Sequence, residues 1–288
     1  MDSGAYDWQL THDLDAFLGR AGEFLRSRPA EHTVALTVTD ALRRRGPHGF
    51  GEGTPVFGFL EREGSVRATF FRTPPYQLSV TPLSEEDADA LAARLADAGH
   101  SPPGVSADRA TATVFAEAWQ RRAGATVTLR RQERLYRLGT LTPPEPAPPG
   151  RARVATEADR DQLARWWAKF TEIIGDRSSR DAGAWADDRI SYGGVTLWET
   201  PDGTPVSMAG ATAQVAGQIR VAPVYTPAHL RGHGYAGAAT AEVSRVALAS
   251  GAEEVLLFTD LANPTSNGLY QRIGYRPVSD FATYDFTA

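Results

Sequence analysis

The sequence contains no cysteine, and this absence excludes disulfide bonds, thiolate metal ligands and cysteine nucleophiles together. Long hydrophobic runs are also missing, because no apolar stretch approaches the roughly 18 residues needed to cross a bilayer. The first residues lack the basic and apolar regions of a signal peptide. We therefore expect a cytoplasmic protein that does not bind membranes.

An excess of basic charge is absent as well. The chain has 30 Lys and Arg against 35 Asp and Glu, which gives a formal net charge of -5 at pH 7. Such a balance provides no general attraction to nucleic acids or anionic lipids. The short basic runs at 43–45 and 130–131 have no aromatic platform for base stacking beside them. We expect no nucleic-acid partner.

The length and the proline distribution predict two domains. At 288 residues the chain exceeds the roughly 100–200 residues of a typical single domain. Residues 142–150 contain five prolines, which favours an extended, semi-rigid spacer. We expect an N-terminal domain at 1–141, a linker at 142–150 and a C-terminal domain at 151–288.

Hydrophobic periodicity predicts a similar order of elements in the two halves. The first half is expected to form helices at 13–26 and 30–45, strands at 56–62, 66–72 and 77–81, helices at 84–98 and 106–122, and a strand at 126–138. The second half is expected to form helices at 157–174 and 180–189, strands at 194–199, 206–215 and 218–225, a long helix, a strand at 254–259, a short helix and a last strand. This shared order suggests a duplicated fold.

A strand interrupted by proline gives the first chemical signal. Residues 221–227 have the sequence Val-Ala-Pro-Val-Tyr-Thr-Pro. Pro223 cannot donate to a sheet ladder, so it favours a bulge that separates this strand from its neighbour. The N–H groups of Val224 and Tyr225 would then lack partners in the sheet. Because buried backbone donors require partners, a ligand is expected at these amides.

A glycine-rich turn follows that strand and precedes an amphipathic helix. Gly232 and Gly234 let the backbone turn tightly and approach a ligand closely. Backbone N–H groups and the positive end of the helix together suit a diphosphate, and Arg231 adds positive charge. Taken alone, these glycines are equally typical of a tight strand-to-helix connection.

Together with the C-terminal segment, this pattern resembles the GNAT superfamily of N-acetyltransferases. Residues 231–236, Arg-Gly-His-Gly-Tyr-Ala, match the superfamily's diphosphate motif of Arg or Gln, two residues, Gly, one residue, and Gly or Ala. Asn263 and Tyr270 match its asparagine-bearing turn and tyrosine-bearing helix, and residues 273–276 resemble its usual helix exit. The resemblance covers about 153–286, and the first half only by its order of elements.

The resemblance implies an α/β (α+β) fold of two tandem GNAT-like domains, each a mixed, mostly antiparallel sheet flanked by helices. No Arg-x-x-Gly-x-Ala motif follows the strand expected at 77–81. We therefore expect the N-terminal domain to be a degenerate GNAT-like domain without a cofactor site, and the C-terminal domain to be catalytic.

The resemblance also implies an N-acetyltransferase that uses acetyl-CoA, or another acyl-CoA, as its co-substrate. A primary amine, most simply that of a small molecule, would attack the thioester directly. The Val224 N–H would stabilise the developing oxyanion, and Tyr270 would act as the general acid for the leaving thiolate. The residues expected to bind the cofactor are Val224, Tyr225, Thr226, Arg231, Gly232, His233, Gly234, Tyr235, Ala236, Asn263 and Tyr270.

The acceptor side is less defined by the sequence. Glu172, Asp176 and Glu199 are candidates for the general base, although each is more typical of a solvated charge. Arg220 is a candidate for binding an acidic group of the acceptor. Four aromatic residues either line the acceptor pocket or pack in the core: Trp166, Trp167, Phe170 and Trp185.

Three alternative interpretations share parts of this pattern. Residues 232–237 spell the G-x-G-x-x-G of a dinucleotide-dependent oxidoreductase. However, Pro227 and three further residues separate the strand from Arg231, and too little chain follows for a doubly wound domain. A non-catalytic acyl-CoA-binding or scaffold protein would keep the same cradle. His229 and His233 are four apart but lie outside a continuous helix, so no metal site is predicted.

Overall fold

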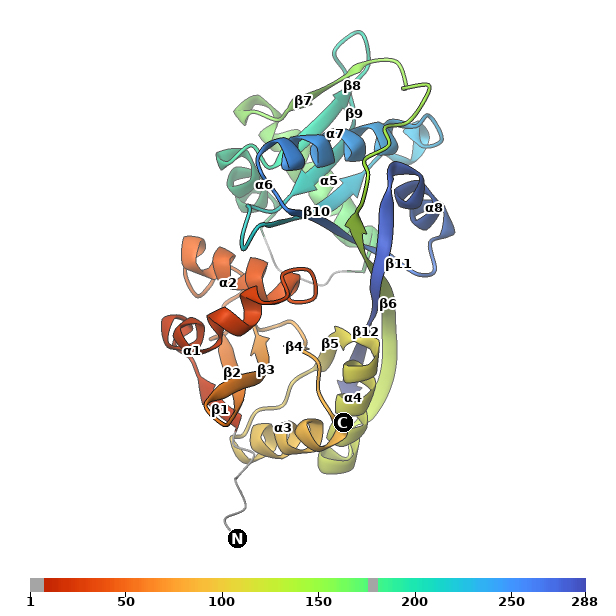
Figure 1. The fold of residues 1–288 in the computed structure, drawn as a ribbon. Helices are drawn as coiled ribbons and strands as arrows, with labels where there is room; N and C mark the ends of the chain where they lie inside the picture. Colours follow the sequence, from red (N-terminus) through yellow and green to blue (C-terminus); the bar gives the residue numbers. More distant parts are fainter. Residues whose placement is uncertain (1–7, 176–180) are drawn as a thin grey trace. The chain divides into compact units, whose positions relative to one another are not determined.

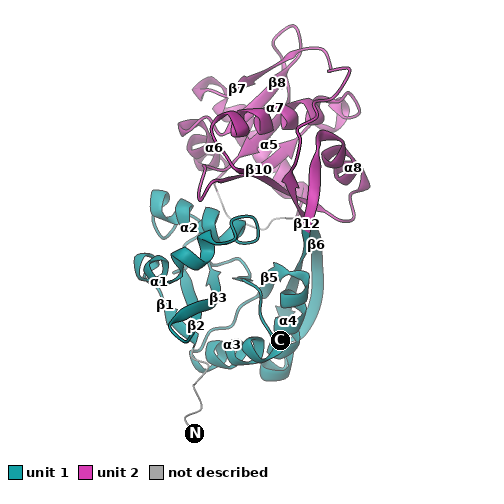
Figure 2. Cartoon of the chain, in the orientation of Figure 1, with its two compact units in different colours: residues 1–134, 279–288 teal, residues 135–278 magenta. Residues whose placement is uncertain are grey.

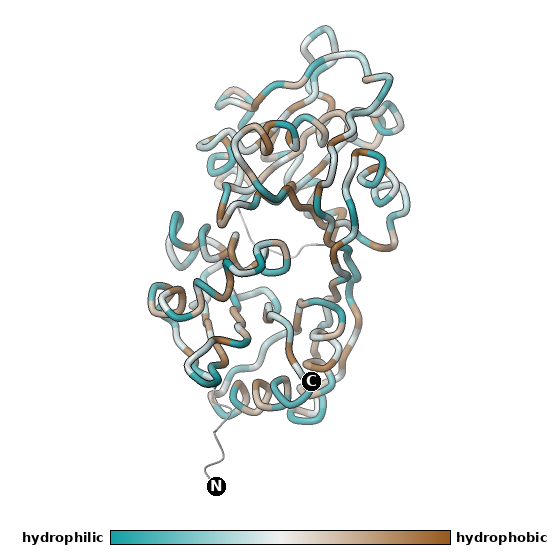
Figure 3. The backbone as a smooth tube through the Cα atoms, in the orientation of Figure 1, coloured by the Kyte–Doolittle hydropathy of each residue, from teal (hydrophilic) through white to brown (hydrophobic). Residues whose placement is uncertain are grey.

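The computed structural model describes residues 8–175 and 181–288. The chain forms two compact units, drawn in different colours in Figure 2. Unit 1 comprises Met1–Arg134 together with Ser279–Ala288, and unit 2 comprises Leu135–Val278. In both units, brown hydrophobic stretches alternate with teal hydrophilic ones along the chain (Figure 3).

In its described residues, unit 1 is a sheet flanked by four helices (Figure 1). Its elements are β1 (Trp8–Thr11), α1 (Leu14–Arg26), α2 (Thr33–Arg45), β2 (Val56–Arg62), β3 (Ser65–Arg72), β4 (Leu78–Val80), α3 (Glu85–Asp97), β5 (Gly104–Asp108), α4 (Arg109–Ala123) and the first part of β6 (Thr126–Leu138). The strand order is β1-β2-β3-β4-β5-β12-β6, in which β4 and β5 run parallel.

Alternating side chains of the unit 1 strands fill two cores. Phe57 on β2 stacks on Phe17 of α1, with ring centroids 5.2 Å apart. Its neighbour Val56 points to the opposite face, because successive strand residues alternate. There it belongs to a cluster that includes Leu91 of α3 and Phe115 of α4. Helices therefore cover both faces of the sheet.

Unit 2 has the same layered plan. Its elements are β7 (Arg151–Val154), a 3₁₀ turn (Glu157–Asp159), α5 (Arg160–Ile173), α6 (Ala182–Ser191), β8 (Val195–Glu199), β9 (Pro205–Ala211), β10 (Gln218–Tyr225), a second 3₁₀ turn (Ala228–Leu230), α7 (Tyr235–Ala249), β11 (Glu254–Asp260), α8 (Pro264–Ile273) and the start of β12 (Tyr275–Thr287). The strand order is β12-β6-β11-β10-β9-β8-β7, with β10 and β11 parallel.

The two faces of this second sheet are again separately covered. Met208 of β9 packs in a cluster with Leu163 of α5 and Trp185 of α6. Ala209, the next residue along β9, packs in a different cluster with Ala239 of α7 and Ile273 of α8. The helices α5 and α6 thus lie on one face, and α7 and α8 on the other.

Strands β6 and β12 are each 13 residues long and contribute to both units. The end of β12 completes unit 1, where Ala282 is buried in the core and Phe286 packs beside Trp119 with ring centroids 6.2 Å apart. The end of β6 completes unit 2, where Tyr136 is fully buried. Each sheet therefore includes a strand that begins in the other unit.

These units differ from the ranges expected from the sequence, 1–141, 142–150 and 151–288. The division falls within β6, at Arg134 and Leu135, and the last ten residues belong to unit 1. The proline segment at 142–150 lies inside unit 2, where the Trp198 Nε1–H donates to the Pro149 carbonyl at 3.2 Å. Continuous strands and side-chain packing set this boundary, so proline content misplaces it.

The helix expected at 106–122 is also corrected, because residues 104–108 form β5 and α4 begins at Arg109. Asp108 ends the strand and caps the helix, since its carboxylate accepts from the Thr111 N–H at 3.1 Å. Among the described residues, no helix has the length and apolar character required to cross a bilayer.

Candidate active site

Strands β10 and β11 pair over only part of their length. Their parallel register runs from Gln218 beside Glu254 to Val221 beside Leu257. β10 continues to Tyr225 and β11 continues to Asp260 without further pairing between these strands. The sheet therefore opens between them, as the position of Pro223 predicts.

The opening coincides with a bulge on the other side of β10. Its register with β9 shifts between Val221, opposite Ala211, and Val224, opposite Ala209. Ala222 and Pro223 thus lie opposite Gly210. A Cβ atom at position 210 would be 2.8 Å from the Ala222 carbonyl oxygen and 2.9 Å from the Pro223 Cδ. Glycine is required here, a role that no sequence motif indicated.

The same register limits the amides that can face the opening. Val224 and Tyr225 are consecutive residues of β10, paired with Ala209 and Met208 of β9. Successive N–H groups of a strand point to opposite edges. One of these two amides, and not both, is therefore available on the open edge.

Hydrogen bonds of the Ser207 and Thr226 hydroxyl groups hold the end of β10 to β9. Thr226 is buried, and its Oγ1 lies 2.8 Å from the Ser207 Oγ. Ser207 Oγ also donates to the Tyr225 carbonyl at 3.1 Å. Because Ser207 engages the Thr226 hydroxyl, Thr226 holds β10 against β9, whereas the sequence suggested it as a cofactor ligand.

Side chains and glycines together shape the turn after β10. Arg231 Nε–H donates to the Thr226 carbonyl at 3.1 Å. His233 Nδ1 lies 3.0 Å from the Arg231 carbonyl oxygen, and its ring stacks on Tyr235 with centroids 5.6 Å apart. Gly232 and Gly234 have φ angles of 85° and 82°, a region in which glycine is favoured.

Helix α7 begins at this turn with free backbone donors. Its N-cap is Gly234, which has no side chain to accept from the first turn, and no acidic residue occupies that turn. The first intrahelical bond runs from the Ala238 N–H to the Gly234 carbonyl at 3.1 Å. The N–H groups of Tyr235, Ala236 and Gly237 precede it and point outward, at the positive end of the helix. This arrangement suits an anion.

Tyr270 of α8 lies in the hydrophobic cluster that separates α7 and α8 from the sheet. Its side chain is 8% exposed, and it meets Tyr275 edge to face with ring centroids 6.1 Å apart. Burial raises the pKa of Tyr270 to about 12. Its hydroxyl has no hydrogen-bond partner among the described residues and remains protonated at neutral pH. The Val224 side chain packs against the same cluster.

A known protein family matches the part of unit 2 that contains these residues. Residues 160–275 match the model of the acetyltransferase (GNAT) family. These residues form a GNAT acetyltransferase domain. The chain therefore contains an acetyltransferase domain of the GNAT type within unit 2. A comparison with curated proteins found no match.

Solved structures extend the likeness to both units. A GCN5-related N-acetyltransferase from Sphaerobacter thermophilus is 19% identical with a TM-score of 0.63, covering 96% of this chain and 94% of that one. A GNAT-family acetyltransferase from Colwellia psychrerythraea is 11% identical with a TM-score of 0.60, covering 98% and 100%. A tandem GNAT protein from the clavulanic acid biosynthesis pathway is 10% identical with a TM-score of 0.56, covering 98% of each chain. The fold is therefore a tandem GNAT fold, with a mixed, mostly antiparallel sheet in each unit.

In the GNAT domain Asn263, expected from the sequence to bind the cofactor, has a structural function. Asn263 is the N-cap of α8, and its Oδ1 accepts from the Ser266 N–H at 3.0 Å. Its side-chain oxygen is thus used within the protein. A network missed at the sequence level also holds α8: the Tyr136 hydroxyl donates to Asn267 Oδ1 at 2.9 Å and accepts from Gln271 Nε2 at 3.1 Å.

The aromatic residues considered for the acceptor pocket mainly form core. Trp185 is 1% exposed and stacks on Trp167 with centroids 4.6 Å apart. Phe170 packs on Trp167 at 6.1 Å. Trp166 is different, because it packs against Tyr225 at the end of β10, with centroids 5.9 Å apart.

Two charged residues considered for the acceptor side, Glu172 and Arg220, make contacts with other side chains of the protein. Glu172 is exposed and pairs with Lys169 at 2.9 Å. The Arg220 guanidinium lies over the Phe258 ring, 6.0 Å from its centroid. Asp176 lies outside the described residues.

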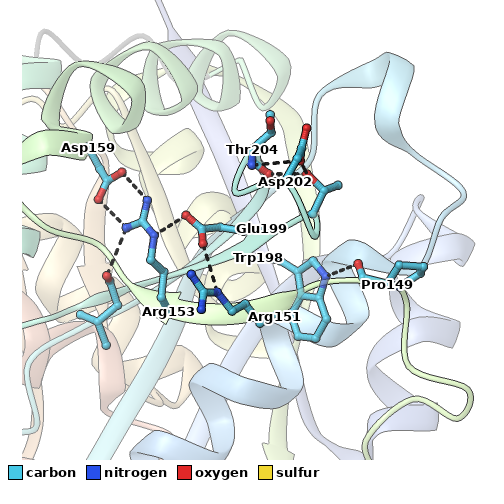
Figure 4. Close-up of polar contacts among 10 residues, drawn as sticks. Pro149, Arg151, Arg153, Asp159, Trp198, Glu199, Asp202 and Thr204 are labelled. Atoms are coloured by element: carbon cyan, nitrogen blue, oxygen red, sulfur yellow. Dashed lines mark hydrogen bonds and ion pairs between the residues drawn. The ribbon is translucent and has the colours of Figure 1, made fainter.

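Glu199 belongs to an ionic cluster at the edge of the sheet (Figure 4). It is 4% exposed and accepts a hydrogen bond from Arg153 of β7. The same guanidinium donates to Asp159 at 2.6 and 2.7 Å, and this pairing lowers the pKa of Asp159. Glu199 therefore joins β8 to β7 through Arg153 and is not a free base.

A metal site needs several ligating side chains close together. No group of three or more histidine, aspartate or glutamate side chains within the described ranges is placed to hold a metal ion. The His233 ring is instead engaged with carbonyl groups of its own turn.

Proposed function

We propose that unit 2 transfers an acetyl group from acetyl-CoA to the primary amine of a small molecule. One observation carries the proposal: the sheet opens after Val221 and Leu257, beside a helix α7 whose first amides are uncapped. The thioester arm would enter the opening, and the amides at the start of α7 would bind the diphosphate.

The open-edge amide of Val224 or Tyr225 would donate to the thioester oxygen. Such a donor is favourable in the transition state, because negative charge develops on that oxygen. The amine nitrogen forms a bond to the carbonyl carbon, and the carbon–sulfur bond breaks with its electron pair going to sulfur. Binding both reactants side by side supplies much of the acceleration.

Tyr270 would give its phenolic proton to the departing sulfur. Its raised pKa keeps this proton in place until the thiolate forms, although it also makes the phenol a weaker acid. The tyrosinate then regains a proton as the ammonium product of the attack loses one, so the step is balanced in protons.

Release of free thiol from acetyl-CoA, measured with a panel of small primary amines, tests this proposal. We expect amine-dependent thiol release with at least one class of amine. Binding of acetyl-CoA without turnover for any amine would instead favour an acyl-CoA-binding protein without catalysis.

A further inference from the structure

We propose that the proline segment at 142–150 braces the diphosphate turn of unit 2, with Pro148 and Pro144 as positioning residues for CoA binding. The inference rests on the proposed function, because it assigns the segment a part in holding that site ready for the cofactor.

The contacts single out these two prolines. Pro148 is buried and Pro144 is half-buried, whereas Pro143, Pro146 and Pro149 are exposed. A Cβ atom at Gly234, the N-cap of α7, would lie 3.8 Å from the Pro148 ring. The Pro148 ring therefore lies beside the beginning of the helix.

The second contact lies one turn further along α7. A Cβ atom at Gly237 would be 3.4 Å from the Pro144 Cγ and 3.0 Å from the Leu269 Cδ1. Pro144 and Leu269 of α8 therefore both approach α7 at Gly237. Glycine at position 237 permits this close approach, because a side chain there would meet both groups.

Both ends of the segment are anchored within unit 2. At its start, the Thr142 N–H donates to the Ile273 carbonyl at 2.7 Å. At its end, the Pro149 carbonyl accepts from Trp198 Nε1–H at 3.2 Å. Between these anchors the segment passes beside the first turn of α7 (Figure 1). Prolines stiffen such a span, because each fixes its own φ angle.

The turn needs support from outside because its own constraints are weak. Gly232 has no atom within 4 Å of its Cβ position, and Gly234 offers no capping side chain. Glycine loses more conformational freedom on ordering than any other residue. A ligand that had to order this turn would bind more weakly by that cost, so a preformed turn favours binding.

The composition of the segment also fits a site for an anion. Its only charged residue is Glu145, which is exposed. Apolar prolines can approach the turn without repelling a diphosphate, whereas carboxylates in their place would oppose it.

The test compares Pro148→Ala with the matched variant Pro143→Ala, using acetyl-CoA and S-acetylpantetheine, which lacks the diphosphate. For Pro148→Ala we expect the KM for acetyl-CoA to rise about fivefold, with kcat and the KM for S-acetylpantetheine unchanged. Pro143→Ala should change neither. Pro144→Ala serves as the second variant and should give the same selective rise.

Three results would overturn the inference. Equal rises in KM for both thioesters would indicate general damage to the domain, and unchanged values for both proline variants would show that the turn holds itself. If the wild-type protein takes up no CoA in a direct titration, the proposed function fails first. That outcome differs from a selective loss confined to Pro148→Ala and Pro144→Ala.

Discussion

At the scale of single residues, the Tyr270 hydroxyl is the group on which the proposed acyl transfer depends most. Tyr270→Phe keeps the buried ring and removes only the proton donor, so we expect kcat to fall about 100-fold or more. The Kd for acetyl-CoA should remain within about threefold of the wild-type value, since the ring still packs in the same cluster. Steady-state kinetics and titration calorimetry together check this. An unchanged kcat would remove Tyr270 as the acid.

The pKa of Tyr270 predicts a loss of stability in alkali. Its folded pKa of about 12 lies above the value of about 10 expected in the unfolded chain. Between these values the folded state keeps a proton that the unfolded state has released, so the free energy of unfolding falls as pH rises from 10 to 12. Urea unfolding of the wild type should show a steeper decline there than Tyr270→Phe. Parallel curves for the two proteins would contradict the assigned burial.

The backbone features of the candidate site could be predicted from sequence, because its glycines and Pro223 have local reasons for their positions, whereas the role proposed for Tyr270 came from the resemblance to the GNAT superfamily. The φ angles of Gly232 and Gly234 and the bulge at Pro223 follow from backbone chemistry alone. The partners of Thr226 and Glu199 could not be predicted, since they come from residues distant in the chain, Ser207 and Arg153.

At the scale of elements, the beginnings of two helices explain why one unit carries the cofactor site. Helix α3 follows β4 in unit 1 as α7 follows β10 in unit 2. Ser84 caps α3, accepting from the Asp87 N–H at 3.2 Å, and Glu85, Glu86 and Asp87 fill its first turn. The Ser84 side chain accepts from a backbone N–H at the N-terminus of α3, and the three carboxylates neutralise the positive charge there. At the N-terminus of α7 neither a capping side chain nor a carboxylate is present.

The substitution Ala236→Glu should therefore give the first turn of α7 a negative charge, as the first turn of α3 has. A carboxylate in the first turn stabilises a helix and repels an anion. We expect the affinity for acetyl-CoA to fall at least about tenfold while the Tm stays equal or rises. Ala236→Gln, with the same size and no charge, is the control. Equal losses of affinity in both variants would indicate a steric effect and count against the electrostatic explanation.

Long periodic elements were predictable, and so were the short strands β4 and β8, whereas the short strands β1, β5 and β7 were not. The strand at 126–138 and that at 218–225 have the expected bounds, and α1 begins one residue later than expected. β1 and β7 have four residues each and β5 has five, too few to show a period of their own. They are strands because a neighbouring strand pairs with them.

At the scale of the whole molecule, the shared strands link the integrity of unit 1 to the end of the chain. Deleting Ser279–Ala288 removes Ala282 from the core of unit 1 and Phe286 from its place beside Trp119. Because total stabilities are about 5–15 kcal/mol, we expect unit 1 to unfold. Limited proteolysis with mass spectrometry should find new cleavages within 8–134. Deleting the exposed Thr287 and Ala288 should not produce them.

This sharing could not be predicted from the sequence. The pattern of β6 and β12 identifies two long strands, but nothing local indicates that each completes both sheets. The prolines at 143–149 suggested a boundary by composition, whereas the packing of Pro148 places them within unit 2.

Calorimetric titration of acetyl-CoA into the full chain tests the central claim most directly, because the two helix ends predict different numbers of sites. An open α7 and a capped, acidic α3 predict one site per chain. A stoichiometry of two, or no uptake of any CoA derivative, would contradict the account.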